Sequence, residues 1–228
     1  MKTLLFTALF AATALAQAAP AAHEHHAHEH DAHAMHAASA PAANAPAHAV
    51  EYHTAMMSMH DDMMKGINLQ NADAAFAAGM LPHHQGAVKM AEIQLKHGSD
   101  RQMNRLAKDI IRTQNAEIKL MQRWLAQHPS EPAGAAAPAH VAEYHASMTG
   151  MHDDMMKGIQ LQNPDAAFAA GMLPHHQGAV KMAEIQLKYG RDNRLRDLAQ
   201  DIIRSQSAEI AFMKRWQEKH SATPPAHH

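Results

Sequence analysis

The chain contains the stretch Met80-Leu-Pro-His-His-Gln-Gly-Ala-Val-Lys-Met90 twice, the second time as Met172 to Met182. The repeat extends further, because residues 73–96 match residues 165–188 at every position, an offset of 92 residues. Both stretches lie within patterns of helical periodicity. Two histidines and two methionines that recur unchanged on a helix suggest ligands of a soft metal ion.

The composition narrows the possible functions. The chain has 228 residues and a formal net charge of −2, so no basic excess points to nucleic acid as a partner. Hydrophobic residues make up 46% of the chain, enough for a packed core. The unusual counts are 22 His, 18 Met and no Cys. Without cysteine there is no disulfide, so stability must come from packing or from bound metal.

Residues 1–19 have the pattern of a secretory signal peptide. Lys2 supplies the positive start, Leu4 to Leu15 is a short apolar run, and Ala14-Leu-Ala16 is a small-residue cleavage site, with Ala16-Gln-Ala18 as a competitor. A membrane-spanning helix needs about 20 apolar residues, which this run does not reach. We therefore expect a periplasmic protein with no membrane span after cleavage.

Composition and repetition divide the remainder of the chain. Residues 20–47 are rich in Ala, Pro and His, with seven histidines between His23 and His36. Such a segment predicts a disordered linker, which either collects metal or is simply solvated. The expected order is then a helical metal-binding repeat at 48–128, an Ala/Pro linker at 129–139, a second repeat at 140–220 and a tail at 221–228.

Each repeat predicts three helices and no sheet. In the first repeat they cover about residues 50–66, 71–96 and 100–127. Asn163-Pro164-Asp165 is a typical helix start, and Asn71 occupies the matching position. Gly98 and Gly190 predict left-handed C-terminal caps. Short connections favour antiparallel neighbours, so we predict an all-α bundle of two tandem three-helix units.

Methionine and histidine recur on the inward faces of the first two helices of each repeat. Residues three or four apart on a helix share a face, which lets their side chains converge. The leading predicted site consists of Met80, His83, His84, Met90 and Met121, and of Met172, His175, His176, Met182 and Met213 in the second repeat. A second predicted cluster consists of His53, Met56, His60, Met63 and Met64, and of His145, Met148, His152, Met155 and Met156.

The third helix of each repeat carries polar residues on an otherwise apolar face. These residues are Gln114 and Glu117, and Gln206 and Glu209 in the second repeat. Buried polar groups need partners. A glutamate directed inward near histidines is expected to orient a metal-bound imidazole through its second ring nitrogen.

The ligand types favour copper. Thioether sulfur is a soft, neutral donor that selects Cu(I), with Ag(I) as its mimic, and imidazole also binds copper. Zinc prefers Cys, His and carboxylate ligands. Cysteine would bind Cu(I) more strongly but oxidises in an exported protein. A cysteine-free chain rich in Met and His therefore fits periplasmic copper handling.

Other interpretations stay open. Methionines at helical spacing are usually core residues. The strongest rival is a helical module that binds a protein partner through Met-rich faces without metal. The second and third helices lack the Glu-x-x-His motif of di-iron bundles, and the chain lacks the His-Glu-x-x-His of zincins and any nucleophile setting. A copper oxidase is conceivable, but Met/His sites favour storage or transfer, so we expect no catalytic residue.

The pattern Ala-Phe-x-x-Gly-Met-x-Pro-His-His-Gln-Gly-Ala-x-x-Met-Ala, followed by Ile-Ile-x-x-Gln-x-x-Glu-Ile-x-x-Met-x-x-Trp, resembles the CopM-type family of secreted copper-binding proteins. The matching positions are Met80, Pro82, His83, His84, Met90, Gln114, Glu117, Met121 and Trp124, with Met172, Pro174, His175, His176, Met182, Gln206, Glu209, Met213 and Trp216. The Met-x-x-Met-His-x-x-Met pattern at Met56 to Met63 and Met148 to Met155 is also similar to copper-resistance members.

This resemblance implies a ferritin-like helical bundle that binds Cu(I), and Ag(I) as a second ion, in periplasmic metal tolerance. It implies no catalysis. The expected partners are copper ions and, for delivery, a copper exporter or another periplasmic copper protein.

Overall fold

Helices make up most of residues 44–221, which are the residues that this computed structural model describes. The first copy of the repeat forms α1 (Ala47–Ile67), α2 (Ala72–His97) and α3 (Arg101–Gln127). The second copy forms α4 (Ala139–Met148), α5 (Met151–Gly158), α6 (Pro164–Tyr189) and α7 (Asn193–Ser221). Within residues 44–221 there is no strand, only an isolated bridge between Leu69 and Pro132. The all-α prediction is confirmed.

Three predicted segments extend beyond this range. The signal peptide at residues 1–19 lies outside the described residues, as do residues 20–43 of the predicted linker and 222–228 of the predicted tail. In the described part of the chain, no helix is long and apolar enough to cross a membrane.

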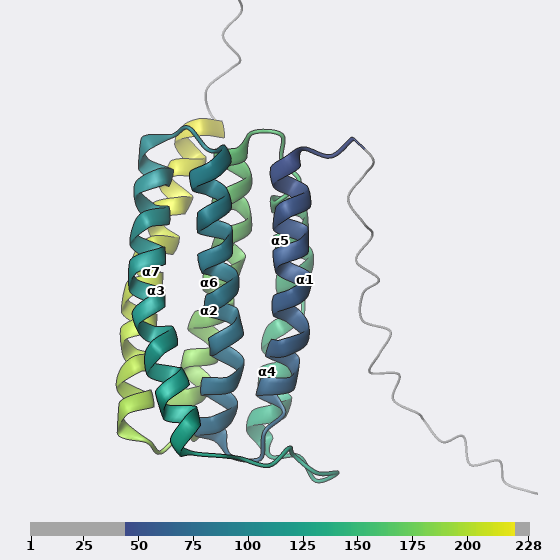
Figure 1. Ribbon diagram of the computed structural model, residues 1–228, viewed down its shortest axis with the longest axis vertical. Coiled ribbons are helices and arrows are strands. Elements are labelled where there is room, and N and C mark those ends of the chain that lie inside the picture. The colour runs from purple at the N-terminus through teal and green to yellow at the C-terminus, as the bar shows by residue number, and fades with distance from the viewer. Residues whose placement is uncertain (1–43, 222–228) are drawn as a thin grey trace, which may run out of the picture. The chain divides into compact units, whose positions relative to one another are not determined.

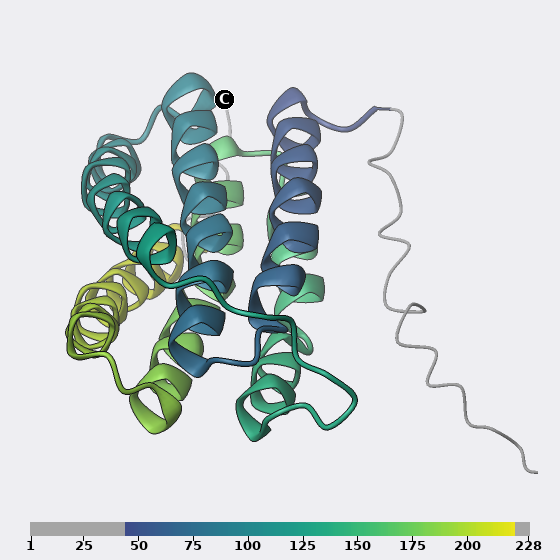
Figure 2. The ribbon, with the colours of Figure 1, turned by 60° about the horizontal axis from the view of Figure 1, so that its bottom comes forward.

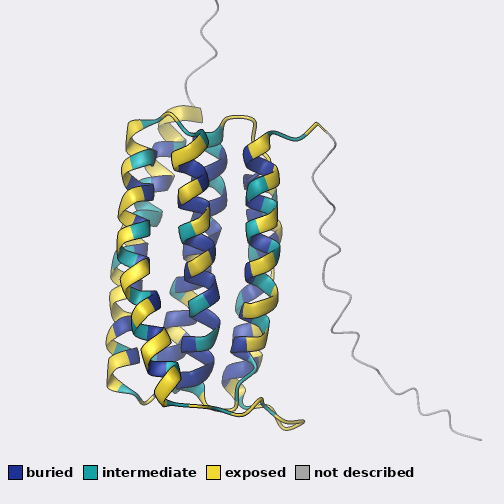
Figure 3. Ribbon diagram, viewed as in Figure 1, coloured by how far each residue is buried: buried dark blue, intermediate teal, exposed yellow. Residues whose placement is uncertain are grey.

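The helices of residues 44–221 lie in three layers, and each layer combines an element of the first copy with its equivalent in the second (Figures 1 and 2). The middle layer is α2 with α6; α3 and α7 flank it on one side, and α1, α4 and α5 on the other. Because α2 and α6 have neighbours on several sides, buried residues occupy most of their surface (Figure 3). The two copies thus share one compact unit.

The helices α2 and α6 run antiparallel and touch directly. The methyl end of Met90 in α2 lies beside Gly171 in α6, and Met182 in α6 lies beside Gly79 in α2. A methionine in the last third of each helix thus packs against the first third of the other. This arrangement places the two copies of the His-His motif opposite each other between the two methionines.

The helix starts behave as predicted, but the glycines at the helix ends do not. The side chains of Asn71 and Asn163 accept the backbone N–H of Ala74 and Ala166, both at 3.0 Å. The prediction of left-handed caps at Gly98 and Gly190 is wrong, because their φ angles are −81° and −73°.

Gly98 is needed for a close contact instead. A Cβ at Gly98 would collide with the Gln94 side chain and would lie 2.6 Å from an oxygen of Asp165 in the other copy. Only glycine leaves room there. Gly190 lies in the same way against the side chain of Gln186.

A buried carboxylate ties each copy to the other. Asp165, in the first turn of α6, accepts hydrogen bonds from Nε2 of Gln94 at 2.6 Å and from the backbone N–H groups of Ser99 and Asp100 at 3.1 Å. It therefore holds the turn between α2 and α3 of the first copy. Reciprocally, Asp73 in α2 accepts from Gln186, Arg191 and Asp192 of the second copy.

The second copy departs from the first in its opening helix. Where α1 is continuous, α4 ends at Met148 and α5 begins at Met151. Gly150 between them has a φ of 80°, which residues with a Cβ rarely adopt. The first copy has Ser58 at this position and continues as a helix. One glycine thus accounts for the break.

The contact of α1 with α2 predicts a measurable cost at Gly66. A Cβ at Gly66 would collide with the backbone carbonyl of Ala78. Pro82 cannot donate an N–H to that carbonyl, so α2 already lacks one hydrogen bond there. We expect Gly66→Ala to lower the free energy of unfolding by about 2 kcal/mol, because overpacking outweighs the gain in helix propensity of about 1 kcal/mol.

Chemical denaturation measures this effect. The control is Gly134→Ala, since a Cβ at Gly134 would meet nothing within 4 Å. An unchanged or higher stability of the Gly66→Ala variant would show that α1 and α2 are not packed this closely.

Candidate metal centre

Four histidines lie together where α2 meets α6, and we call them the central histidine cluster: His83 and His84 from the first copy, His175 and His176 from the second. The ring centroids of His83 and His175 are 3.8 Å apart. The rings of each adjacent pair have centroids 6.4 and 6.3 Å apart. All four residues are fully buried. The identical motifs of the two copies thus meet each other inside the protein.

Glutamates of the outer layer fix two of these rings. Glu117 in α3 accepts a hydrogen bond from Nε2 of His84 at 2.7 Å, and Glu209 in α7 accepts one from Nε2 of His176 at 2.6 Å. A carboxylate acceptor requires the proton on Nε2, so in the neutral ring Nδ1 carries the free lone pair. This arrangement is typical of histidines that bind a metal through the other nitrogen.

Most nitrogens of the cluster have no partner. Among the described residues, no hydrogen bond reaches Nδ1 of His84, Nδ1 of His176, or either ring nitrogen of His83 and His175. Buried polar atoms are normally satisfied, and each one left unpaired costs about 1–3 kcal/mol. Several unpaired nitrogens in one place therefore destabilise the folded protein unless a ligand binds them.

The surroundings keep two of the imidazoles neutral. Burial, followed by repulsion from neighbouring imidazoles, holds the pKa of His83 well below its ordinary value of 6.5. Burial and then repulsion from neighbouring imidazoles also lower the pKa of His175, and the backbone of His83 offsets a small part of that shift. Neutral imidazole is the form that binds metal, so both rings are ready to act as ligands without losing a proton.

These lowered pKa values predict acid sensitivity. Below about pH 6.5 the unfolded chain binds protons at His83 and His175, whereas the folded protein does not. The free energy of unfolding therefore falls as the pH falls. The two groups together contribute a slope of up to about 2.7 kcal/mol per pH unit. Denaturant titrations of the metal-free protein between pH 7 and pH 5 measure this slope. The variant His83→Leu/His175→Leu should show a shallower slope, and an equal slope would contradict the assignment.

The predicted methionine ligands do not stay within one copy. One core cluster contains Met56 and Met90 of the first copy with Met155, Met172 and Met213 of the second. The other contains Met63, Met80 and Met121 with Met148 and Met182. Each cluster holds the counterparts of the methionines in the other, so the core has the approximate two-fold symmetry of the repeat.

The leading predicted set is therefore divided. Met80 and Met121 belong to a different core cluster from Met90. Ten residues on a helix span about 15 Å, too far for Met80 and Met90 to bind one ion. The grouping of these methionines in one copy-internal site was wrong, because sulfur atoms of one copy pack against the other copy. All of the predicted methionines of α2, α3, α6 and α7 are nevertheless fully buried.

Only some residues of the second predicted cluster are directed toward the core. The buried stripe of α1 consists of Tyr52, Met56, Met59, Met63 and Ile67. His53, His60 and Met64 lie half-buried at its edges, as does Met156 of α5. His145 is exposed, and its Nε2 lies 2.9 Å from Oδ1 of Asn68, so the prediction that it faces inward was wrong.

Two further histidines of this set approach each other across the copies. The rings of His60 and His152 have centroids 5.6 Å apart. They hold equivalent positions in the two copies, as His83 and His175 do. The cross-copy pairing is thus a general property of this fold.

Met59 and Met151 were absent from the predicted ligands. Their sulfur atoms pack against Gly86 and Gly178, which follow the histidines by one turn. The repeated Met-x-x-Met-His-x-x-Met pattern contained the signal that could have identified them.

The glutamates and the glutamines that were predicted beside the metal have different surroundings. Glu117 and Glu209 contact the cluster as described above, whereas Gln114 and Gln206 are buried with Oε1 atoms that lack a hydrogen-bond partner among the described residues.

The donor set fits a soft ion better than zinc. Among residues 44–221, no three His, Asp or Glu side chains are arranged as a ready metal site. Structural zinc sites normally need four such ligands, or cysteines. The core instead holds buried imidazoles and, in its two hydrophobic clusters, buried thioethers, and this combination of donors suits Cu(I) and Ag(I).

Comparison with known proteins agrees with this fold. The family described as "Domain of unknown function (DUF305)" matches residues 73–217, from α2 to α7 and hence across both copies. Among proteins with curated descriptions, none matches the chain.

Several solved structures are similar. CopM in the Cu(I)-bound form is 37% identical, with a TM-score of 0.50, over 64% of this chain and 96% of the CopM chain. CopM in the Cu(II)-bound form is 36% identical, with a TM-score of 0.52, over 65% and 97%. A DUF305 protein from Streptomyces coelicolor, provisionally described as secreted, is 28% identical with a TM-score of 0.56, over 70% and 98%. Since the family match covers more than half of the sequence, the chain belongs to the DUF305 family.

Proposed function

We propose that this protein binds Cu(I), with Ag(I) as a mimic, in the central histidine cluster and the methionine clusters beside it, and that it sequesters or delivers copper in metal tolerance. The observation that carries the proposal is the set of unpartnered imidazole nitrogens at the contact of α2 and α6. Coordination by a metal would satisfy these nitrogens and offset their burial.

The elements around the cluster support a role in binding metal. His83 and His175 approach each other from different copies, so an ion held by both would also link α2 to α6. Glu117 and Glu209 orient the two outer rings so that their free nitrogens are available for a ligand. These two carboxylates also place negative charge near the cluster, which favours a cation.

The choice of copper rests on chemistry and on relatives. Buried thioethers on either side of the cluster favour a soft ion. CopM has been solved with Cu(I), Cu(II) and Ag bound. Nearly the whole CopM chain aligns with about two thirds of this chain. The signal-like residues 1–19 and the description of the Streptomyces relative support export to the periplasm. The role proposed is binding without catalysis, with transfer to a copper exporter or another periplasmic copper protein.

An anaerobic competition titration against a chromogenic Cu(I) chelator tests this function. We would use the chain without residues 1–47, so that the His-rich segment does not contribute, and compare it with His83→Ala/His84→Ala/His175→Ala/His176→Ala. The parent should withdraw two or more Cu(I) per chain and the variant fewer. If the parent competes no better than the variant, the histidines are structural, and a partner-binding module with Met-rich faces becomes the better interpretation.

A further inference from the structure

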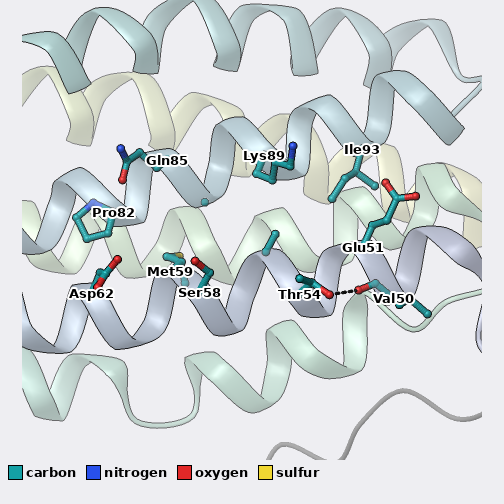
Figure 4. Close-up of a pocket in the computed structure, with 12 residues that line it drawn as sticks. Val50, Glu51, Thr54, Ser58, Met59, Asp62, Pro82, Gln85, Lys89 and Ile93 are labelled. Carbon is teal, nitrogen blue, oxygen red and sulfur yellow. Dashed lines mark hydrogen bonds between the residues drawn. The ribbon is translucent and has the colours of Figure 1, made fainter.

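Two equivalent grooves lie at the surface beside the helix segments that carry the two His-His motifs. The larger, of about 510 Å³, lies between α1 and α2 (Figure 4) and is lined among others by Ser58, Met59, Asp62, Pro82 and Gly86. The smaller, of about 160 Å³, lies between α5 and α6 and is lined at the equivalent positions by Gly150, Met151, Asp154, Pro174 and Gly178. We call these the uptake grooves.

A methionine forms part of the wall of each uptake groove. Met59 is 5% exposed, and Met151 is half-buried. In Figure 4, Met59 lies on α1 between Ser58 and Asp62 and across from Pro82 of α2. The Met59 sulfur packs on Gly86, and the Met151 sulfur packs on Gly178. These two thioethers therefore stand between solvent and the buried core.

At the smaller groove, the wall formed by Met151 and Gly178 lies close to a histidine of the other copy. The position that a Cβ would occupy at Gly178 is in contact with the Met151 sulfur and lies 3.5 Å from Nε2 of His83. The Met151 sulfur thus occupies the space that a side chain at position 178 would fill, on the side of the helix where this nitrogen lies. That nitrogen is one of those without a hydrogen-bond partner among the described residues.

The repeat extends the argument to the other groove. Met59, Gly86 and His175 correspond to Met151, Gly178 and His83 when the copies are exchanged. The lining of each groove carries both charge signs, with Asp62 and Lys89 in the larger and Asp154 and Lys181 in the smaller, so selection of the ion falls to the thioether. A soft cation that enters either groove meets one thioether first, and at the smaller groove an imidazole lies behind it.

We propose that Met59 and Met151 are the uptake ligands, which receive Cu(I) or Ag(I) in the grooves and pass it to the imidazole of the opposite copy. This inference rests on the proposed function and adds the route by which the ion passes from the surface to the histidines. A thioether is a neutral donor, so it can hold a soft ion without the tight ionic binding that would stop its release. No redox step is involved, because the ion only exchanges ligands.

Stopped-flow transfer of Cu(I) from a coloured chelator complex tests the route with Met59→Leu/Met151→Leu. Leucine keeps the volume of methionine and removes only the sulfur. We expect the uptake rate constant to fall by roughly tenfold or more, a rise in the transfer barrier that one lost ligand can cause. The equilibrium number of bound ions should stay at the parental value. The control is Met57→Leu, a half-buried methionine of α1 that lines neither groove.

The variant Gly86→Ala/Gly178→Ala tests the same route without removing a ligand. Its new methyl groups would displace the two sulfur atoms, and the one at position 178 would also lie beside Nε2 of His83. Uptake should slow as in the methionine variant, while circular dichroism shows an intact helical fold.

The outcomes separate the two proposals. If the parent binds no Cu(I) at equilibrium, the proposed function fails and the route with it. If the parent binds Cu(I) but the methionine variant takes it up at the parental rate, only the route is overturned. A variant that keeps the parental rate but binds fewer ions would also overturn it, since Met59 and Met151 would then be permanent ligands.

Discussion

The variant His83→Leu/His175→Leu should bind Cu(I) at least roughly a hundredfold more weakly and yet be more stable without metal. Loss of a residue that only hydrogen-bonds to a metal ligand often lowers metal affinity 10- to 100-fold, so loss of two direct ligands should lower it more. Both rings are fully buried, and none of their four nitrogens has a partner among the described residues. Leucine of similar size removes that penalty, and we expect a gain of roughly 2–4 kcal/mol in the free energy of unfolding.

Two measurements on the same samples check this pair of effects. Competition titration gives the Cu(I) affinity, and urea denaturation of the metal-free protein gives the stability. The control is His97→Leu, since His97 is half-buried near the end of α2 and pairs with Glu51 instead of the cluster. A double variant that is less stable than the parent and binds Cu(I) as tightly would mean that the histidine pair serves packing alone.

Replacing Asp165 with alanine should destabilise the protein by roughly 4 kcal/mol. The substitution leaves the Gln94 amide and two backbone N–H groups without their acceptor, and each unpaired buried donor costs about 1–3 kcal/mol. The loss also frees the turn before α3 from the second copy. Asp73→Ala should cost a similar amount, because Asp73 makes the reciprocal contacts.

Thermal and denaturant unfolding of both variants measure the effect. The control is Asp109→Ala, since Asp109 is exposed and forms a surface ion pair with Arg112 at 3.2 Å. Such a pair contributes about 0–1 kcal/mol. If Asp165→Ala were no worse than Asp109→Ala, the two copies would not be held together by these carboxylates.

Features that depend on neighbouring residues could be predicted from the sequence. The helix starts at Asn71 and Asn163 follow from a local hydrogen bond to the third residue on, and the structure shows that bond. The burial of His83 follows from helical periodicity, whereas His84, at the edge of that face, is buried because α2 has neighbours on several sides. The contact of Glu117 with His84 was also expected, since both residues lie on faces directed to the core.

The pairing between copies could not be predicted, because an exact repeat has no information on which copy supplies a partner. By sequence pattern, Met90 packs as well against Met121 of its own copy as against Met172 of the other. The antiparallel contact of α2 with α6 decides in favour of Met172. Gly98 was misinterpreted for a related reason, since the atom that requires a glycine there belongs to Asp165, far away in sequence.

The inward face of α1 was placed too broadly. Helical angles alone put His53 and His60 on the same side as Met56 and Met63. The helix packs mainly against α2, and that contact sets the centre of its buried stripe at Met56 and Met59. The break after α4 has an equally local cause in Gly150, whose left-handed backbone a sequence pattern alone does not require.

The most direct test of the central claim is anomalous diffraction from crystals of the protein loaded anaerobically with Cu(I). The account predicts an anomalous peak within bonding distance of an imidazole nitrogen from each copy, with His83 and His175 as the ligands. Peaks that contact residues of only one copy, or that all lie away from the contact of α2 with α6, would contradict it.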